Sequence, residues 1–325
     1  MRKINIAIVG LGNIGSYLYK YLKKNKQILA KKNNCIPNII YLSAKNKNRN
    51  RGFKINNKQW VKNYLDVTKK KEVDLIIELI GGSEGPAKKL VFNALKNKKH
   101  VVTANKALIS NYGDQLSKIA EKNRVNLEFE AAVCGGVPII RSLKESLIAN
   151  KINKVYGIFN GTSNYILSLM EKENKSLNEV LIKAQKLGYA ESNPTSDLSG
   201  EDVAAKLKIL SSLCFNSFLN KNIHVEGIRD IDKDDINYAK KLGYKIKLLG
   251  YAELIGKDIF QRVHPTLIRN SSYSGSIDGV LNAVIIDGKP VGQSIIQGEG
   301  AGAAATTSAL ISDISSILRG NIKFP

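Results

Sequence analysis

The sequence predicts an α/β fold in which a parallel sheet covered by helices is followed by a second domain of α+β type. Three observations predict it. The chain has 325 residues, enough for two hydrophobic cores. Short apolar runs alternate with helix-like stretches over the first part of the chain. A glycine-rich turn, GLGNIG, directly follows the first apolar run and opens a helical pattern. Together these features are typical of a Rossmann-like nucleotide-binding domain.

Five apolar runs in the first part predict strands, at residues 4–9, 37–43, 73–80, 100–103 and 125–130. Helical patterns lie between or after them, at residues 14–24, 87–97 and 112–122. Continuous apolar strands that alternate with helices indicate a parallel sheet covered on both faces. The insert 44–64 is polar and basic, so we expect it on the surface.

After Gly135 the pattern changes to a group of helices followed by a meander of strands. Helices are expected at residues 139–150, 164–173, 177–187, 200–215 and 235–242. Strands are expected at residues 245–253, 259–267, 282–286 and 292–297. The last stretch opens with glycines and continues as a helix with an apolar face, at about 302–319, which we expect to pack on the first domain. The predicted domains are therefore 1–134 and 135–301.

The formal net charge of +22 has two interpretations. It could serve a polyanionic partner, since lysine and arginine supply most of the non-specific affinity for nucleic acids. The basic residues are instead dispersed in pairs and triplets without interleaved aromatics, which favours a solvated surface and attraction of a small anionic cofactor. We therefore expect no nucleic-acid partner. The three cysteines are widely spaced and no apolar run reaches 18 residues, so we expect a cytoplasmic protein without a membrane span.

The glycine turn predicts a dinucleotide site. Gly10 allows the tight turn, Gly12 lets a pyrophosphate approach the backbone, and Gly15 permits close packing of helix on strand. A plain strand–helix turn that is rich in glycine is the alternative. The residues expected at the cofactor are Gly10, Leu11, Gly12, Asn13, Ile14 and Gly15.

The end of the second predicted strand indicates which dinucleotide binds. An NAD enzyme usually has an acidic residue there for the ribose 2′-hydroxyl. This chain has no acid at that place and offers Lys45 and Arg49 instead, which suit a 2′-phosphate. We therefore expect NADP, with NAD as the possible alternative.

Hydride reduction of a carbonyl leaves an oxyanion that needs a proton, so the protein must supply a donor. The three histidines, His100, His224 and His264, are expected to be structural. Asp202 and Lys206 lie four residues apart on one predicted helix and therefore share a face. They could form an ordinary surface ion pair or, because apolar residues surround Lys206, a partly desolvated general acid. Spacing alone leaves both possibilities open.

The segment AQKLGYAESNPTSDLSGEDVAAK, residues 184–206, resembles the signature of homoserine dehydrogenases. The likeness continues in ELIGG (78–82), VVTANKAL (101–108), EAAVCGGVPII (130–140), GIFNGTSNYIL (157–167), RVHPTLI (262–268) and GEGAGAAATTSA (298–309). It covers nearly the whole chain in family order. A rival, an aspartate-semialdehyde dehydrogenase, needs a nucleophilic cysteine beside a histidine, and Cys134 has no histidine nearby in sequence.

The resemblance implies the reversible reduction of L-aspartate 4-semialdehyde to L-homoserine with NADPH or NADH, on the path to threonine, methionine and isoleucine. It implies Lys206 as proton donor and Lys106 as a second catalytic lysine near the nicotinamide. The substrate would be bound by Glu191, Asp197, Asp202 and Tyr189. Further cofactor contacts would come from Lys106, Gly188 and Gly302.

The resemblance also implies a monovalent cation, usually sodium, held mostly by backbone carbonyls. The matching residues are Glu130, Val133, Gly135 and Val137. A tight glycine hinge between domains is a compatible interpretation of the same segment. The family further implies a homodimer built on the second domain. Many relatives continue into a regulatory domain, and we expect this chain to lack it and its threonine feedback.

Overall fold

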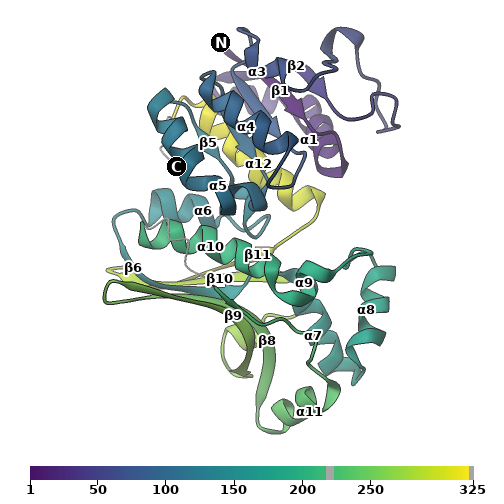
Figure 1. Cartoon of the computed structure of the whole chain (residues 1–325), viewed down its shortest axis with the longest axis vertical. Coiled ribbons are helices and arrows are strands. Elements are labelled where there is room, and N and C mark those ends of the chain that lie inside the picture. The colour runs from purple at the N-terminus through teal and green to yellow at the C-terminus, as the bar shows by residue number, and fades with distance from the viewer. Residues whose placement is uncertain (217–222, 322–325) are drawn as a thin grey trace. The chain divides into compact units, whose positions relative to one another are not determined.

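The computed structural model describes residues 1–216 and 223–321, and the chain divides into two compact units (Figure 1). The first unit comprises Met1–Gly135 together with the segment that begins at Gly302. The second unit comprises Gly136–Ala301. Each unit has its own sheet and its own helices, and each is described separately below.

The first unit has a five-stranded parallel sheet in the order β2-β1-β3-β4-β5. The strands are β1 Arg2–Val9, β2 Cys35–Ser43, β3 Leu75–Glu78, β4 His100–Thr103 and β5 Leu127–Glu128. The central strands β3 and β4, LIIE and HVVT, are buried along almost their whole length, as a sheet covered on both faces requires. The predicted parallel sheet is confirmed.

Helices connect these strands and cover the sheet. They are α1 Asn13–Lys24, α2 Lys26–Asn33, α3 Asp66–Lys69, α4 Pro86–Lys96, α5 Lys106–Asn123 and α12 Ala303–Leu318, with 3-10 turns η1 Asn57–Gln59 and η2 Glu130–Ala132. Leu18 and Leu22 of α1 share one core cluster with Leu310 and Ile314 of α12. Helix α12, yellow in Figure 1, thereby brings the last part of the chain onto the first unit.

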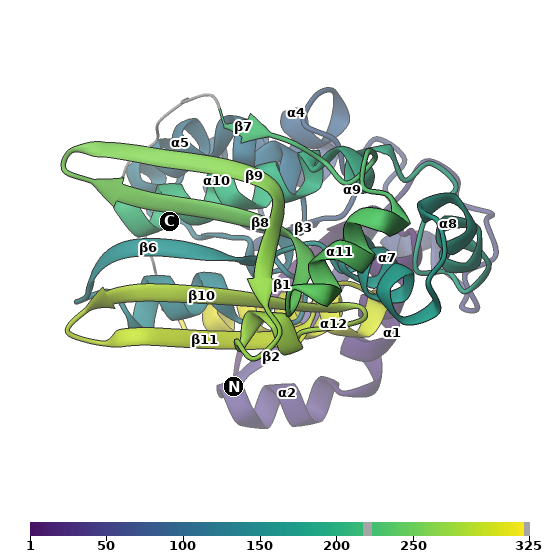
Figure 2. The same ribbon diagram turned by 90° about the horizontal axis from the view of Figure 1, so that it is seen from below.

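The second unit has a six-stranded sheet in the order β11-β10-β6-β8-β9-β7. The strands are β6 Lys151–Ile158, β7 His224–Val225, β8 Tyr244–Ile255, β9 Asp258–Arg269, β10 Leu281–Lys289 and β11 Gly292–Glu299. Two long antiparallel hairpins, β8–β9 and β10–β11, flank β6 (Figure 2), and β7 pairs with β9 in parallel. The predicted combination of helices and meandering strands is confirmed.

The helical elements of this unit are α6 Ile139–Arg141, η3 Ser142–Ser146, α7 Gly161–Glu173, α8 Leu177–Lys186, α9 Thr195–Ser199, α10 Glu201–Phe215, α11 Lys233–Lys241 and η4 Ser274–Ser276. Helix α10 packs on β6 and β8 and buries Val203, Leu207 and Leu210 there. Because Lys206 precedes Leu207 and lies one turn from Val203, its stem is carried into the same buried face.

Several parts of the predicted pattern differ from the structure, and three of them have a clear physical reason. The helix expected over 139–150 lasts one turn and continues as a π-helical turn, in which the Leu147 N–H donates to the Ser142 carbonyl at 2.8 Å. The sequence pattern does not reveal β6, whose lysines and asparagine are depleted in strands, although Ile152 and Val155 are buried. It also does not reveal α2, which has no clear apolar face.

The insert 44–64 is less external than its polarity suggests. Most of its residues are exposed, but Phe53 packs its ring 4.4 Å from the ring of Tyr19. Ile55 and Trp60 pack against the same core cluster. The apolar residues are spaced without a strand or helix period, so the sequence pattern gave no sign of this packing.

Candidate active site

The glycine turn of the first unit has the geometry that a bound pyrophosphate needs. Gly10 has a φ of +103°, and a Cβ there would lie 2.3 Å from the carbonyl oxygen of Leu79. A Cβ on Gly15 would lie 2.0 Å from the carbonyl oxygen of Gly10. A Cβ on Gly12 would meet no atom within 4 Å, so the backbone is open at this point. Helix α1 begins at the next residue and directs its unpaired N–H groups toward the opening.

All six residues of the turn line a cleft, here called the cofactor cleft, made of two adjoining cavities of about 430 and 1200 Å³. Its walls include the end of β2 and the basic side chains Lys45, Arg49, Arg51 and Lys62. The structure therefore brings the two predicted contacts for a 2′-phosphate, Lys45 and Arg49, to the same cleft as the glycine turn. Lys62 was not among the predicted residues.

Arg51 holds the basic loop after β2 against the glycine turn. Its guanidinium donates to the carbonyl oxygens of Leu11 at 3.0 Å, Asn46 at 2.5 Å, Lys47 at 3.1 Å and Arg49 at 2.9 Å. Burial, and secondarily the positive charge of Arg49, lowers the pKa of Arg51. No sequence signal separates this arginine from the many basic residues around it, because its function here is to bind backbone.

A buried carboxylate connects the motifs ELIGG and TANK. Glu78 accepts hydrogen bonds from the backbone N–H groups of Ile80 at 2.7 Å and Gly81 at 3.0 Å, and from the Thr103 hydroxyl at 2.5 Å. The Thr103 oxygen in turn accepts from the N–H of Asn105 at 3.0 Å.

Asn105 is the N-cap of α5, because its side chain accepts from Leu108 N–H at 3.1 Å, and its amide also donates to the Gly82 carbonyl at 2.7 Å. The network therefore fixes the helix start at which Lys106 is the first residue.

In the second unit, Lys206 is buried and paired. Its ammonium lies 2.7 Å from Asp202 Oδ2 and donates to the carbonyl oxygen of Phe159 at 2.6 Å. The side chains of Lys206 and Asp202 are 11% and 6% exposed. Asp202 and Lys206 therefore form a buried, largely desolvated ion pair and not an ordinary surface ion pair.

Asn160 joins this pair to a second carboxylate. Its amide nitrogen donates to Asp197 Oδ1 at 2.7 Å and to Asp202 Oδ2 at 2.8 Å. We call Asn160, Asp197, Asp202 and Lys206 the Lys206 cluster. Asn160 comes from the turn between β6 and α7, about 40 residues away in sequence, so the spacing around Lys206 cannot reveal it.

The other residues predicted to bind substrate lie in the loop before α9. Tyr189 is 46% exposed and packs its ring 4.7 Å from the ring of Tyr165, and its carbonyl accepts from the Thr162 hydroxyl at 2.9 Å. Glu191 is exposed. Gly188, with a φ of +77°, ends the turn after α8. The structure thus brings Asp197 and Asp202 together with Lys206 and leaves Glu191 exposed.

The residues predicted for a monovalent cation are divided between the units. Glu130, Val133 and Gly135 follow β5 in the first unit, and Val137 belongs to the second. Glu130 is buried, and its N–H donates to Asp313 Oδ2 of α12 at 2.9 Å. Within residues 1–216 and 223–321, no group of three His, Cys, Asp or Glu side chains is placed to hold a metal ion.

The three histidines lie on strands β4, β7 and β9. His100 is half-buried at the start of β4, and its Nδ1 accepts from the Asn126 N–H at 3.0 Å. Burial lowers the pKa of His100, because it disfavours the charged imidazolium. Burial also lowers the pKa of His264 on β9, and His224 lies exposed on β7.

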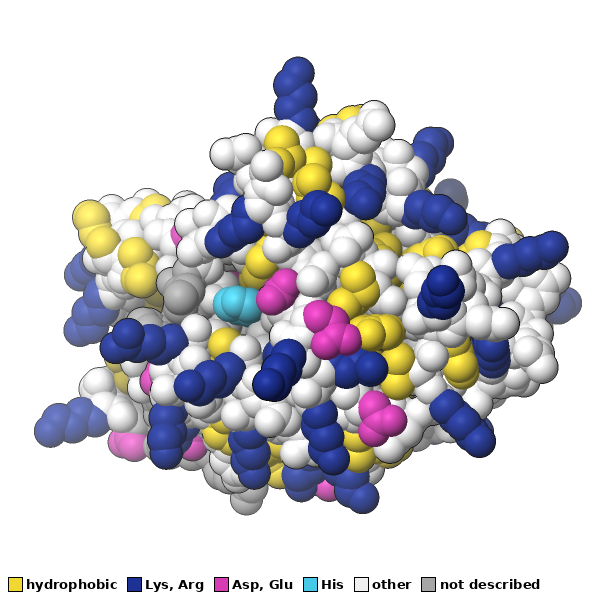
Figure 3. All heavy atoms as spheres, turned by 90° about the horizontal axis from the view of Figure 1, so that it is seen from above, with side chains coloured by type: hydrophobic (Ala, Val, Ile, Leu, Met, Phe, Trp, Pro, Cys, Tyr) yellow, Lys and Arg dark blue, Asp and Glu magenta, His cyan; other side chains and the backbone are white. Residues whose placement is uncertain are grey.

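On the face drawn in Figure 3, Lys and Arg side chains are scattered among neutral and apolar groups and form no single stripe. No described helix is long and apolar enough to cross a membrane.

The chain is similar to proteins of known activity along its whole length. Residues 138–315 match the family model described as homoserine dehydrogenase, and residues 10–130 match its NAD-binding domain. It is 42% identical to the homoserine dehydrogenase of Neisseria gonorrhoeae, over 98% of this chain and 73% of that protein.

Solved structures agree. A homoserine dehydrogenase from Thiobacillus denitrificans superposes with a TM-score of 0.93 at 40% identity, over 98% of this chain and 74% of that one. A hyperthermophilic archaeal homoserine dehydrogenase, described in complex with NADPH, has the same fold, with a TM-score of 0.82 at 23% identity over 99% of this chain and 100% of that one.

Proposed function

This chain belongs to the homoserine dehydrogenase family, and we propose that Lys206 is the residue that exchanges the proton in its reaction. The family's activity is an oxidation–reduction at a CH–OH group, the interconversion of L-aspartate 4-semialdehyde and L-homoserine. The observation that carries the proposal is the buried ammonium of Lys206, held by Asp202 and the Phe159 carbonyl.

The geometry suits proton transfer to an alkoxide. When hydride reaches the aldehyde carbon, negative charge develops on the oxygen, and a neighbouring ammonium both stabilises that charge and supplies the proton. Asp202 favours the charged form of Lys206 before the reaction, and the Phe159 carbonyl orients its nitrogen. In the reverse direction the neutral amine accepts the hydroxyl proton of homoserine.

The nearby carboxylates suit the other end of the substrate. We propose that Asp197, Asp202 and Glu191, with Tyr189, bind its ammonium and hydroxyl groups. Carboxylates are the natural partners of an ammonium group, and the exposed loop that carries Glu191 and Tyr189 leaves them accessible to solvent. We propose Lys106, fixed at the start of α5 by the Glu78–Thr103–Asn105 network, as the second catalytic lysine.

The family binds a nicotinamide cofactor, which supplies or accepts the hydride. We propose that this chain prefers NADP, with Lys45 and Arg49 at the 2′-phosphate, the turn residues 10–15 at the pyrophosphate, and Gly188 and Gly302 beside the cofactor. The basic wall of the cofactor cleft supports this preference. Steady-state kinetics with NADPH and NADH test it: kcat/KM with NADPH should be the higher, and Lys45→Ala should lower it roughly tenfold or more while changing the NADH value less. A clear preference for NADH would contradict it.

We further propose that a sodium ion binds at the carbonyls of Glu130, Val133, Gly135 and Val137, where it would order the turn after β5. Replacing sodium by a bulky organic cation should lower the thermal unfolding temperature and the activity together. An unchanged unfolding temperature in sodium-free buffer would contradict the site. We also propose a cytoplasmic homodimer that uses the second unit, and light scattering of the purified protein would test its mass.

Lys206→Met tests the proposed proton donor, with Lys240→Met, an exposed lysine of α11, as the matched control. We expect kcat for semialdehyde reduction to fall by roughly 10²–10⁴-fold in Lys206→Met, the usual contribution of a general acid, and to stay unchanged in Lys240→Met. Removing Lys206 leaves a buried Asp202 charge, so Lys206→Met combined with Asp202→Asn serves as a second, better-folded form. Near wild-type turnover in the folded variants would exclude Lys206 as the donor.

A further inference from the structure

Asn160 uses its whole side chain in hydrogen bonds. It is 4% exposed and lies in the turn between β6 and α7. Its Oδ1 accepts from the Ser163 N–H at 2.7 Å, which caps α7. Its Nδ2 donates one hydrogen to Asp197 Oδ1 at 2.7 Å and the other to Asp202 Oδ2 at 2.8 Å. One side chain therefore joins α7, α9 and α10.

The cap alone does not explain the choice of asparagine. Aspartate and serine cap helices as well as asparagine does, because each offers a side-chain oxygen to the N3 N–H. The two carboxylate contacts have a stricter requirement, since they need a nitrogen with two hydrogens to donate. Among common cap residues only asparagine meets both requirements.

A neutral donor between two carboxylates also has an electrostatic effect. Asp197 Oδ1 and Asp202 Oδ2 both lie within 2.8 Å of one nitrogen, so their negative charges oppose each other at short range. The amide hydrogens stabilise both charged forms without adding a charge of their own. Because Asp202 Oδ2 also contacts the Lys206 ammonium at 2.7 Å, the position of Asp202 determines where that ammonium lies.

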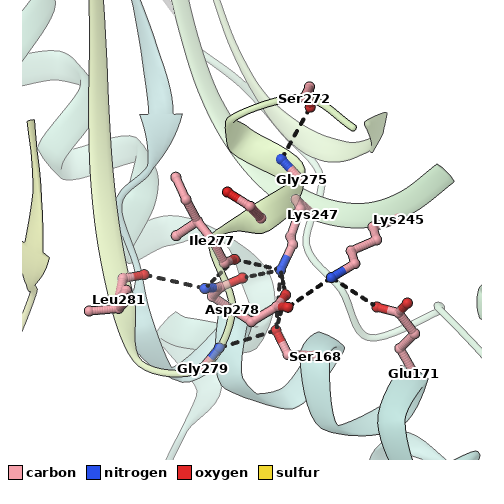
Figure 4. Close-up of polar contacts among 12 residues, drawn as sticks. Ser168, Glu171, Lys245, Lys247, Ser272, Gly275, Ile277, Asp278, Gly279 and Leu281 are labelled. Atoms are coloured by element: carbon pink, nitrogen blue, oxygen red, sulfur yellow. Dashed lines mark hydrogen bonds and ion pairs between the residues drawn. The ribbon is translucent and has the colours of Figure 1, made fainter. Parts of the chain in front are cut away.

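Helix α7, which Asn160 caps, is itself held in place by several buried hydrogen bonds. Lys247 of β8, 1% exposed, donates to Asn164 Oδ1 at 2.8 Å. It also donates to Ser168 Oγ at 3.2 Å and to Asp278 Oδ1 at 2.7 Å (Figure 4). Asn164 also donates to the carbonyl oxygens of Ile277 and Leu281. These contacts hold the first two turns of α7 on the sheet, so the residue that caps the helix cannot shift easily.

We propose that Asn160 is a positioning residue of the reaction, which holds Asp197 and Asp202 side by side and through Asp202 orients Lys206. The inference rests on the proposed function of Lys206. Asn160 takes no part in proton transfer. It holds two like charges close together, and it holds the ammonium of Lys206 within hydrogen-bond distance of the position that the substrate oxygen would occupy.

Asn160→Asp is the sharpest test, because it keeps the cap and the size of the side chain and replaces both donors by a third carboxylate. We expect kcat/KM for the semialdehyde to fall tenfold or more while the NADPH dissociation constant stays unchanged. Added negative charge favours the protonated forms of the carboxylates and of Lys206. Both limbs of the plot of kcat/KM against pH should therefore move to higher pH. Asn56→Asp, the same change at an exposed cap of η1, is the matched control and should move neither limb.

Asn160→Ser is the second variant, because serine keeps the cap but does not reach the carboxylates and adds no charge. It should also lower kcat/KM tenfold or more, and it carries the test if Asn160→Asp does not fold. A folded Asn160 variant with wild-type kcat/KM and unmoved pH limbs would overturn the proposal. Lys206→Met, measured in parallel, separates the two questions: if it remains active, the proposed proton donor is wrong, whereas an inactive Lys206→Met beside a fully active Asn160→Asp rejects only the positioning role.

Discussion

The cofactor cleft and the Lys206 cluster are built in opposite ways. The cleft is made largely of backbone: three glycines, the start of α1, and a loop that Arg51 holds by its carbonyl oxygens. The Lys206 cluster is made of polar side chains, three of them charged and all at least partly buried, that come from the turn before α7, from α9 and from α10.

This difference determines which substitutions disturb each region. A backbone site fails when an added atom occupies the space of the chain or the ligand, and the fold around it can remain intact. A buried side-chain cluster fails when one partner is lost, because the charge that remains has no compensation. Substitutions should therefore separate cofactor binding in one region from chemistry and stability in the other.

Gly15→Ala should have the largest effect on binding. Its Cβ would lie 2.0 Å from the Gly10 carbonyl oxygen, so the turn and α1 must move apart. We expect the NADPH dissociation constant, measured by fluorescence titration, to rise by roughly 100-fold, about 2.7 kcal/mol. Gly113→Ala is the control, because its Cβ would meet Ile109 at an ordinary 3.6 Å. It should leave the dissociation constant unchanged, and equal values for both variants would contradict the backbone account.

Lys247→Met should have the largest effect on stability. The lysine donates to Asn164, Ser168, Asp278 and the Ile277 carbonyl, and methionine can replace none of these contacts. We expect the free energy of unfolding to fall by about 3–5 kcal/mol in denaturant titrations. Lys245→Met removes a neighbouring lysine that also contacts Asp278 but is 17% exposed, and it should cost much less. If both variants lost a similar free energy of unfolding, the burial of Lys247 would contribute little to the stability of the fold.

The two regions also differ in how far the sequence predicts them. The glycine turn lies in one window of six residues between a strand and a helix, so its spacing alone predicts its geometry. The pairing of Asp202 with Lys206 follows from helical spacing as well. Asn160 cannot be found in this way, because only the tertiary fold brings the turn before α7 to the start of α10. Strand β6, which leads to that turn, is hidden by its own lysines and asparagine.

Arg51→Lys should sharpen the comparison on the cofactor side. Lysine keeps the charge but cannot reproduce the fork that contacts four carbonyl oxygens. We expect the NADPH dissociation constant to rise roughly tenfold, with kcat at saturating cofactor nearly unchanged. If kcat at saturating cofactor also fell about tenfold, the loop would affect the chemical step as well as cofactor binding.

His100→Asn should have the smallest effect, limited to the pH dependence of stability. Burial lowers the pKa of His100 in the folded protein, so the unfolded chain binds the proton more readily. Wild-type stability should therefore decrease as the pH falls below about 6.5 toward the folded pKa. Asparagine keeps an acceptor for the Asn126 N–H, and the variant should lose this part of the slope. An unchanged slope would mean that other groups cause it.

The central claim is that the two regions divide the work, with cofactor binding in the glycine turn and proton exchange at Lys206. The most direct test measures the NADPH dissociation constant and the kcat for semialdehyde reduction in Gly15→Ala and Lys206→Met side by side. The account predicts that Lys206→Met binds NADPH like the wild type but turns over roughly 10²–10⁴-fold more slowly. Gly15→Ala should bind NADPH far more weakly. If Lys206→Met weakened NADPH binding as much as Gly15→Ala does, or kept its turnover, the division would be contradicted.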